Sequence, residues 1–535
     1  MHNLIKLSIK LINYFAYIFF TNLILSNNVN TLAKLNELQY NTTSGIYEAK
    51  LVKIAAYSAH KNRPTYVHKI VGIPYAEKPE RFAQSVMKNY EPGIHYSQEP
   101  VFCHQSVNIS AYGLFSLLDP PRMSEDCLTV NLYIPVPSSP EEEKQLKNMS
   151  VLIHIHGGSN MVGGASLFDG TMLAGHGKLI VAIINYRLSI LGFLSDMTEK
   201  YSGNYGLRDQ ILAINWIKNN CPVLNCNPNS ITLWGHSAGA GDVNWLSVSP
   251  LSNHLFQRVI IQSGSSFSYW GFDKMPTERY KALKTYFNCP DLPEQYTPKN
   301  GAMTKLIENC LTNVPLNDLF SFKFSLIDAP GPVYDGFLGE NSLINEYTPK
   351  EMIDKNTKRS ILDLDILTGI NGVEGFSFEG YFSSSVRFWA QNNLTNEVVL
   401  TLERISLLTR EKCSQGSIIA NRGLIEQFYE SKVEKLLADN SDINSEEAKR
   451  LKAIFVNSDF IFDIGFIELV KVLSEKRAEN EYAKHGNLFV YEYLHENTGS
   501  QANFNAFKRY LKKNFPLSTH FDGIDLAFGL CTFFK

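Results

Sequence analysis

A serine between two glycines is the residue of this chain best suited to nucleophilic chemistry. The pentapeptide GHSAG at residues 235–239 places Ser237 directly after the short apolar run Ser230–Trp234. The pattern G-x-S-x-G after a strand is typical of a sharp strand-to-helix turn that exposes the hydroxyl as a nucleophile. The flanking glycines let neighbouring backbone approach without Cβ clashes. We therefore predict that Ser237 attacks an acyl carbon; the alternative is a glycine-rich turn with an incidental serine.

A second glycine motif contains backbone N–H groups that could stabilise the resulting oxyanion. The motif HGGS at residues 156–159 follows the apolar run Val151–His156. In hydrolases with G-x-S-x-G, an HGG-type motif donates to the oxyanion together with the residue after the nucleophile. The loss of one such donor costs roughly 3–4 kcal/mol. The sequence predicts an oxyanion hole made by Gly157, Gly158, Ser159 and Ala238, with a plain glycine turn as the alternative.

A serine nucleophile of this type requires an acid and then a histidine later in the chain. Spacing alone allows five carboxylates as the acid, namely Asp335, Asp363, Asp365, Glu374 and Glu379. The acid should lie on a loop beyond the carboxyl end of a strand, which favours Glu374 because it follows the run DILTGI.

Three histidines follow Glu374, and they are not equally placed. His485 precedes the apolar run NLFVYEYL and so lies at the wrong end of a strand. His495 directly follows that run, and on pattern alone it competes with His520 for the role of base.

Short apolar runs bounded by turn residues indicate buried parallel strands. They are Val151–His156, Leu179–Tyr186, Ser230–Trp234, Arg258–Gln262, Asp363–Leu367 and Asn487–Leu494. Apolar residues at helical spacing predict an amphipathic helix over Tyr205–Asn219, so that strand, helix and strand alternate. Pro137–Ser150 is expected to be a solvated loop and Leu437–Lys452 a charged, mostly helical segment. The pattern predicts an α/β sheet with helices on its faces, in one large domain.

Several blocks resemble a single known family. The segment SEDCLTVNLYIP at residues 124–135 resembles the EDCL signature of the type-B carboxylesterases, a family that also contains the cholinesterases. Further blocks in family order are GIPYA at 72–76, NYRL at 185–188, GNYGLRDQ at 203–210 and PVYDG at 332–336. The resemblance runs from about residue 45 to the end of the chain. It implies an α/β-hydrolase fold with a mostly parallel central sheet, helices on both faces and large loop insertions.

The resemblance also implies the members of the triad. GINGVEG at residues 369–375 is similar to the family's G-x-N-x-x-E-G, and HFDGIDLAFG at 520–529 is similar to its histidine block. A triad of Ser237, Glu374 and His520 is therefore implied, which leaves His495 a surface histidine. His520 would accept the proton of Ser237, Glu374 would orient the imidazole, and water would hydrolyse an acyl-enzyme. Such a site takes a small-molecule ester and requires neither a metal nor an organic cofactor.

Some residues depart from the family pattern. His236 stands where many members have Glu, Gly523 replaces a Glu three residues after the histidine, and Ser159 replaces a third glycine. A positive φ at Ser159 would be costly for a residue with a side chain. Cholinesterases place a Trp before the EDCL block to bind quaternary ammonium, and the stretch LLDPPR at 117–122 contains none. General carboxylic esters are therefore expected rather than choline esters.

The chain contains eight cysteines, an even number that fits disulfide bonding in an oxidising compartment. The resemblance implies the pairs Cys103–Cys127 and Cys289–Cys310. Cys221 and Cys226 are near enough in sequence to pair with each other, and Cys413 and Cys531 are left unassigned. Neither a CxxC motif nor a cluster of cysteine and histidine is found, so no zinc site is expected.

The N-terminal segment has the pattern of a secretory leader. Lys6 and Lys10 precede the apolar run Leu11–Leu25, and polar residues follow it. This run is short for a membrane span, so we predict a signal peptide over residues 1–28 and a single domain over 29–535. An uncleaved anchor is the alternative, and only in that case is a membrane a partner. N-glycosylation motifs at Asn41, Asn108, Asn148 and Asn393 agree with a secreted or luminal glycoprotein.

Composition and length set the remaining expectations. The 535 residues are 44% hydrophobic and have a net charge of −3, which argues against a nucleic-acid partner. The chain ends soon after the histidine block, so we expect a domain shortened at its C-terminal end. Two other functions stay open: a non-catalytic adhesion or binding protein of the neuroligin kind, and a lipase-like esterase of long acyl chains.

Overall fold

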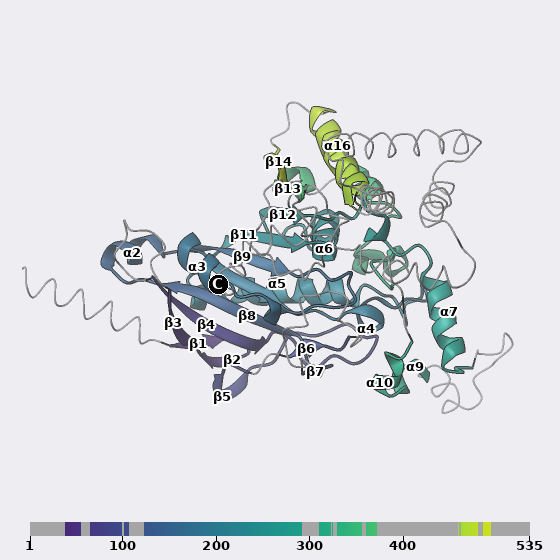
Figure 1. Ribbon diagram of the computed structural model, residues 1–535, viewed down its shortest axis with the longest axis horizontal. Coiled ribbons are helices and arrows are strands. Elements are labelled where there is room, and N and C mark those ends of the chain that lie inside the picture. Colours follow the sequence, from purple (N-terminus) through teal and green to yellow (C-terminus); the bar gives the residue numbers. More distant parts are fainter. Residues whose placement is uncertain are drawn as a thin grey trace, which may run out of the picture.

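A central sheet of nine strands organises the part of the chain that the computed structural model describes (Figure 1). The described residues are 38–54, 65–98, 101–105, 122–290, 310–322, 324, 329–355, 360–371, 458, 462–479 and 485–493. The strand order is β14-β13-β12-β11-β9-β10-β8-β4-β3. In chain order the strands are β3 (Lys50–Ile54), β4 (Thr65–Pro74), β8 (Thr129–Val136), β9 (Met149–Ile155), β10 (Ile180–Ile184), β11 (Cys226–His236), β12 (Arg258–Gln262), β13 (Asp365–Asn371) and β14 (Leu488–Tyr493).

The six strands from β14 to β10 pair in parallel, and β8, β4 and β3 continue the sheet antiparallel. The prediction of a mostly parallel sheet is therefore confirmed. Each of the six parallel strands overlaps a predicted apolar run, although the bounds differ. The strand expected at Asp363–Leu367 begins two residues later, because Ile361–Asp363 forms a short 3-10 helix, η5, with a capping box from Ser360.

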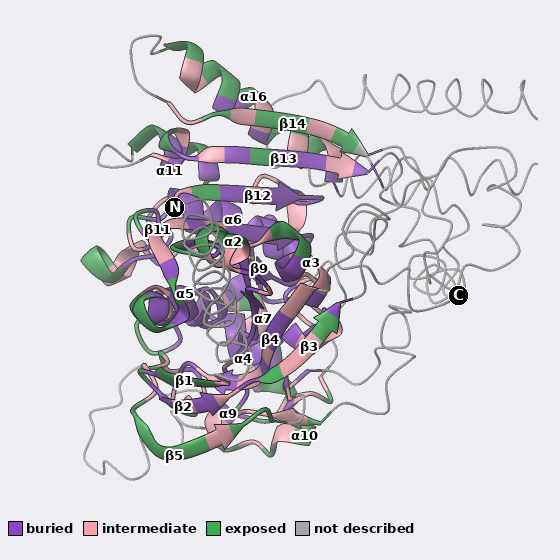
Figure 2. Ribbon diagram, turned by 90° about the vertical axis from the view of Figure 1, so that its left-hand side faces the viewer, coloured by how far each residue is buried: buried purple, intermediate pink, exposed green. Residues whose placement is uncertain are grey.

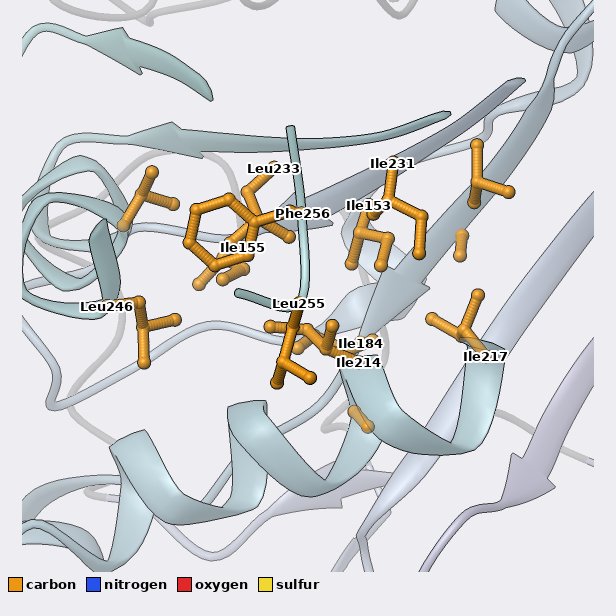
Figure 3. Close-up of a cluster of buried hydrophobic side chains, with 14 of the residues drawn as sticks. Ile153, Ile155, Ile184, Ile214, Ile217, Ile231, Leu233, Leu246, Leu255 and Phe256 are labelled. Atoms are coloured by element: carbon orange, nitrogen blue, oxygen red, sulfur yellow. The ribbon is translucent and has the colours of Figure 1, made fainter. Parts of the chain in front are cut away.

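Helices cover both faces of the sheet. On one face, α5 (Tyr205–Leu224) and α6 (Ala238–Val248) enclose an apolar cluster with Ile153 and Ile155 of β9 (Figure 3). On the other face, α3 (Thr171–Gly177) packs over β4, β8 and β10, and Leu152 of β9 belongs to that cluster. Successive residues of one strand are thus buried on opposite sides, which explains why these strands are apolar without alternation.

Helix α5 is five residues longer than the predicted Tyr205–Asn219. It runs through Pro222 and ends at Leu224, and the C-cap residue Asn225 adopts a left-handed conformation and donates its N–H to the carbonyl of Cys221. A disulfide joins Cys221 to Cys226, the first residue of β11. The last turn of the helix is therefore covalently attached to the strand that leads to Ser237.

The expectation of a loop over Pro137–Ser150 is wrong in part. Residues Pro140–Gln145 form helix α2, and β9 already begins at Met149. Ser139 caps the helix by accepting a hydrogen bond from the N–H of Glu142 at 3.3 Å, Pro140 occupies its first turn, and three acidic residues follow. These start signals favour a helix despite the absence of an apolar face.

The remaining described elements lie around the sheet (Figures 1 and 2). A small sheet contains β1 (Gln39–Thr42), β2 (Gly45–Glu48) and β5 (Glu91–Tyr96), and β6 (Phe102–Cys103) pairs with β7 (Met123–Ser124). The helices are η2 (Ala165–Leu167), α4 (Ser189–Phe193), η3 (Tyr269–Gly271), α7 (Pro276–Tyr286), α9 (Cys310–Asn313), α10 (Leu316–Leu319), η4 (Gly336–Asn341), α11 (Pro349–Lys355) and α16 (Ile464–Glu479), which lies beside β14. None of the helices in the described ranges is long and apolar enough to cross a membrane.

Disulfides also join Cys103 to Cys127 and Cys289 to Cys310, the two pairs that the family resemblance implied. The predicted leader at residues 1–28, the segment Leu437–Lys452, Cys413 and Cys531 lie outside the described residues.

Candidate active site

Ser237 occupies the turn between β11 and α6 in a strained backbone conformation. Its φ is 58° and its ψ is −125°, and the residue is 8% exposed. A residue with a side chain is held in this region only when the surrounding structure enforces it, and such strain is concentrated at functional sites. The Ser237 N–H donates to the carbonyl of Gln262 at the end of β12 (2.9 Å), and its own carbonyl accepts from the N–H of Ala240 (2.9 Å). The turn is therefore fixed from both the sheet and the helix.

Two glycines beside Ser237 allow the close packing that this turn requires. A Cβ placed on Gly235 would overlap the carbonyl of Gly239. A Cβ placed on Gly239 would overlap the carbonyl of Ile155 and lie 2.7 Å from the carbonyl oxygen of His156. The first turn of α6 thus lies directly against the end of β9. This brings the turn at Ser237, called the elbow below, next to the segment that follows β9.

That segment contains the predicted oxyanion donors. A Cβ on Gly157 would lie 2.8 Å from the Cβ of Ser237 and 2.6 Å from the carbonyl oxygen of His236, so the two motifs are in contact. The N–H groups of Gly157, Gly158, Ser159 and Ala238 donate no hydrogen bond to any described residue. Ala238 is the first residue of α6, where N–H groups have no partner within the helix and the helix dipole favours negative charge.

The oxyanion loop, defined here as residues 157–164, bends sharply after its first glycine. Gly158 has a φ of 116°, and its carbonyl accepts from the N–H groups of Met161 and Val162 at 3.0 Å each. Ser159 and Asn160 follow with φ values of 57° and 54°. The side chain at Ser159, where the family usually has glycine, is therefore held in a left-handed conformation, at a cost of about 1–2 kcal/mol.

Buried side chains hold this loop. Gln105 exchanges two hydrogen bonds of 2.9 Å with the backbone of Gly163. The Tyr186 hydroxyl donates to the carbonyl of His156 at 2.8 Å, and the His156 ring stacks on Tyr186 with centroids 4.5 Å apart. Burial lowers the pKa of His156 to about 4, so this imidazole is neutral at pH 7 and acts as a packing group.

Three of the five carboxylates that were candidates for the triad acid have structural roles instead. Asp335 is fully buried, accepts from the N–H groups of residues 343 and 344, and pairs with Arg208 at 2.9 Å. Asp363 closes the capping box of η5. Asp365 begins β13 and accepts from Asn487, so it lies at the end of the sheet opposite to Ser237.

Strand register places the carboxyl end of β13 beside the elbow. His236 pairs with Gln262, and Gln262 pairs with Gly369. Strand β13 ends at Asn371, three residues before Glu374. His485 lies at the other end, where Gly486 donates its N–H to the carbonyl of Leu362 at 2.9 Å.

Other residues of the sequence prediction are not described. Glu374, Glu379, His495, His520, Gly523 and the stretch 117–121 lie outside the described residues, as do the glycosylation motifs at Asn108 and Asn393. The acceptor residues Asn41 and Asn148 of the other two motifs are exposed. Within the described part of the chain, no group of three histidine, cysteine or acidic side chains could hold a metal ion.

Sequence reasoning missed Asp242, a carboxylate buried in α6 near the elbow. Its only signal was a lone acidic residue in the otherwise uncharged helix AGAGDVNWLSV. Burial raises the pKa of Asp242 to about 7, and hydrogen bonds from Gln210 and Asn160 offset this effect only in part. The side chain therefore titrates near neutrality although it is 1% exposed.

Replacing Asp242 by Asn is expected to flatten the pH dependence of folding stability. The folded protein retains this proton between the ordinary carboxyl pKa of 3.8 and about 7, whereas the unfolded chain releases it. The free energy of unfolding of the wild type should therefore fall as the pH rises across this range, by roughly 4 kcal/mol from this group alone. Urea unfolding of both proteins between pH 4 and 8 measures the difference, and parallel curves would contradict the prediction.

Comparison with known proteins identifies the family. The sequence model of the carboxylesterase family matches residues 53–534. The chain belongs to the carboxylesterase family. The α/β-hydrolase fold inferred from the sequence blocks agrees with this membership and is confirmed by the sheet.

Within the carboxylesterase family the chain is similar to a neuroligin, an acetylcholinesterase and an esterase. It is 30% identical to human neuroligin-2 over 376 residues, which are 62% of this chain and 42% of neuroligin-2. It is 29% identical to acetylcholinesterase-1 of Trittame loki over 79% of this chain and 73% of that protein. It is 39% identical to esterase E4 of Myzus persicae over 42% of this chain and 40% of that protein. The chain thus spans less than half of neuroligin-2 and esterase E4.

Proposed function

We propose that the protein is a carboxylic-ester hydrolase with Ser237 as nucleophile, Glu374 as acid and His520 as base. The observation that supports this most strongly is the contact between the strained Ser237 turn and Gly157. The N–H groups of Gly157, Gly158, Ser159 and Ala238 also donate no hydrogen bond to a described residue. Similarity to esterase E4 supports the same activity.

The proposed mechanism assigns one role to each residue. His520 accepts the proton of the Ser237 hydroxyl as its Oγ attacks the ester carbonyl, and Glu374 orients the imidazole and stabilises its cation. The oxyanion then lies near the N–H groups of Gly157, Gly158, Ser159 and Ala238. Collapse of the tetrahedral intermediate releases the alcohol after His520 returns the proton, and water activated by His520 frees the acid. The reaction uses neither a metal nor an organic cofactor.

A non-catalytic adhesion or binding function is the second candidate, because neuroligins are among the similar proteins. Only the hydrolase candidate predicts that the protein turns over an ester. A panel of 4-nitrophenyl esters from acetate to palmitate, tested with the wild type and with Ser237→Ala, separates them. We expect hydrolysis that depends on Ser237. A folded wild type that hydrolyses no ester of the panel would favour the binding function, and a preference for palmitate would favour the lipase-like alternative.

We further propose that the protein enters the secretory pathway as one domain over residues 29–535 after removal of residues 1–28. The three disulfides and the exposed glycosylation acceptors Asn41 and Asn148 support this location. Enzymatic deglycosylation of protein secreted from eukaryotic cells should lower its apparent mass, and an unchanged mass together with retention in the cytosol would contradict the proposal.

A further inference from the structure

Asp242 connects the helix of the nucleophile to the oxyanion loop. Its Oδ1 accepts a hydrogen bond from the Asn160 side-chain amide at 3.1 Å, and its Oδ2 accepts from the Gln210 amide at 2.7 Å. All three side chains are at most 5% exposed. Among the described residues, no cation pairs with this carboxylate, and both of its donors are neutral amides. A buried charge satisfied only by amides is costly, so a structural role alone would be served as well by a neutral residue.

Asn160 anchors the middle of the oxyanion loop to its surroundings. It directly follows Ser159, shares its left-handed conformation, and accepts the N–H of Ser189 on its carbonyl at 2.6 Å. The single hydroxyl proton of Tyr186 is shared between the carbonyl of His156 at 2.8 Å and, as the longer contact, the side-chain oxygen of Asn160 at 3.2 Å. The side chain of Asn160 is thus held mainly by Asp242 through its nitrogen.

We propose that Asp242 is a positioning residue that fixes the oxyanion loop against the nucleophile through Asn160. The inference deepens the proposed function, because it names what holds the predicted donors at Gly157–Ser159 in place. Without this bond, the consecutive left-handed residues Ser159 and Asn160 lose a fixed partner on the α6 side, and the loop gains freedom. Donors that are not preorganised stabilise an oxyanion less.

The charge of Asp242 is expected to matter for this role. Hydrogen bonds to an ionised acceptor are roughly twice as strong as those between neutral groups, and burial raises the pKa of Asp242 to about 7. Below this pH the carboxyl is neutral, and its hydrogen bond from Asn160 is no longer strengthened by a charge. Its O–H then needs an acceptor, and the Oε1 of Gln210 has no described partner.

No described charged group on the elements around α6 forms an ion pair with Asp242. Burial raises the pKa of Tyr186 and lowers the pKa values of His154 and His156, which keeps all three uncharged at pH 7. The other groups are His236 on β11, Tyr269 on η3, and the ion pairs Arg187–Asp209, Arg208–Asp335, Arg258–Asp365, Lys350–Asp354 and Lys355–Glu346.

Four variants test the proposal in the full chain. Asp242→Ala and Asn160→Gly each remove the bond, and glycine at 160 keeps the left-handed backbone without strain. Asp242→Asn keeps the shape without the charge. The matched control is Val243→Ala, which removes core contacts from the next residue of α6. Turnover is counted per active site, titrated with a fluorophosphonate at complete reaction, so that misfolded protein does not contribute.

At pH 8.5 we expect Asp242→Ala and Asn160→Gly to lower kcat per titrated site by tenfold or more, with KM changed less than threefold. Val243→Ala should retain the wild-type kcat per site. Asp242→Asn should be lowered roughly three- to tenfold at pH 8.5 and match the wild type at pH 6, where the wild-type carboxyl is itself protonated. A ratio to the wild type that does not depend on pH would overturn the charge-dependent role. A faster Asp242→Asn enzyme at pH 8.5 would also overturn it, because the charge would then oppose the oxyanion.

A second readout does not require esterase activity. Hydrogen–deuterium exchange followed by mass spectrometry reports on peptides that cover residues 157–162. We expect faster exchange there in Asp242→Ala and Asn160→Gly and no change in Val243→Ala. Equal exchange in the wild type, Asp242→Ala, Asn160→Gly and Val243→Ala would refute the positioning role. A wild type that exchanges as expected but hydrolyses no ester would refute the proposed function and leave the positioning result standing.

Discussion

Replacing Ser237 by alanine is expected to lower kcat for a carboxylic ester by a factor of roughly 10⁴ to 10⁶ while leaving the fold intact. Alanine retains the Cβ that already occupies the strained turn, with a φ of 58°, and removes only the oxygen that attacks. The small remaining rate would come from the oxyanion donors. Steady-state hydrolysis of 4-nitrophenyl acetate, with thermal unfolding as the test of folding, measures both quantities.

Ser263→Ala is a matched control for this variant. Ser263 is also a buried serine that follows a strand with a positive φ, 53°. Its hydroxyl has no partner among the described residues, so its removal should change kcat less than threefold. Glu374→Gln and His520→Ala should each lower kcat by orders of magnitude, and adding Ser237→Ala to either should lower it little further, because the triad acts as a unit. Unchanged turnover in Glu374→Gln or His520→Ala would overturn that residue's assignment.

Replacing Gly239 by alanine is expected to destabilise the fold by more than about 3 kcal/mol. A Cβ at this position overlaps the carbonyl of Ile155, a backbone group that is fixed inside the sheet and cannot move away cheaply. The elbow could then no longer lie against β9. We expect loss of soluble protein or a large fall in the midpoint of thermal unfolding, followed by circular dichroism.

Gly241→Ala provides the comparison within the same helix. Its Cβ would lie 3.2 Å from the Trp270 ring and otherwise meet ordinary contacts. Since alanine favours a helix over glycine by about 1 kcal/mol, Gly241→Ala should be close to neutral in stability. Equal stability of the two variants would show that the approach of α6 to β9 is not what Gly239 permits.

The inner parallel strands of the sheet were predictable because they are buried on both faces, whereas the edge strand β14 exposes Phe489 and Val490. Ile180–Ile184 of β10 is buried at every position, so the run is continuously apolar and bounded by turns. Strands β3, β4 and β5 escaped notice because lysine, histidine or other polar residues interrupt their apolar runs and none of them is buried at every position. Helix α2 was missed because its stability comes from its cap and its first turn rather than from an apolar face.

The candidate site was predictable where chemistry follows from local pattern. The elbow and the oxyanion loop are each defined by a few consecutive residues next to a strand, and the structure brings these two segments into contact. The bond between Asn160 and Asp242 joins residues 82 positions apart. Nothing in either segment alone indicates this partner, since the contact depends on how α6 packs against the end of β9.

The measurement that tests the central claim most directly is covalent labelling with a fluorophosphonate, followed by mass spectrometry of peptides. We expect one adduct on Ser237 in the wild type, the same adduct in Ser263→Ala, and none in Ser237→Ala. A folded wild type that takes no adduct, or one that is modified at another residue, would contradict the assignment of Ser237 as the nucleophile.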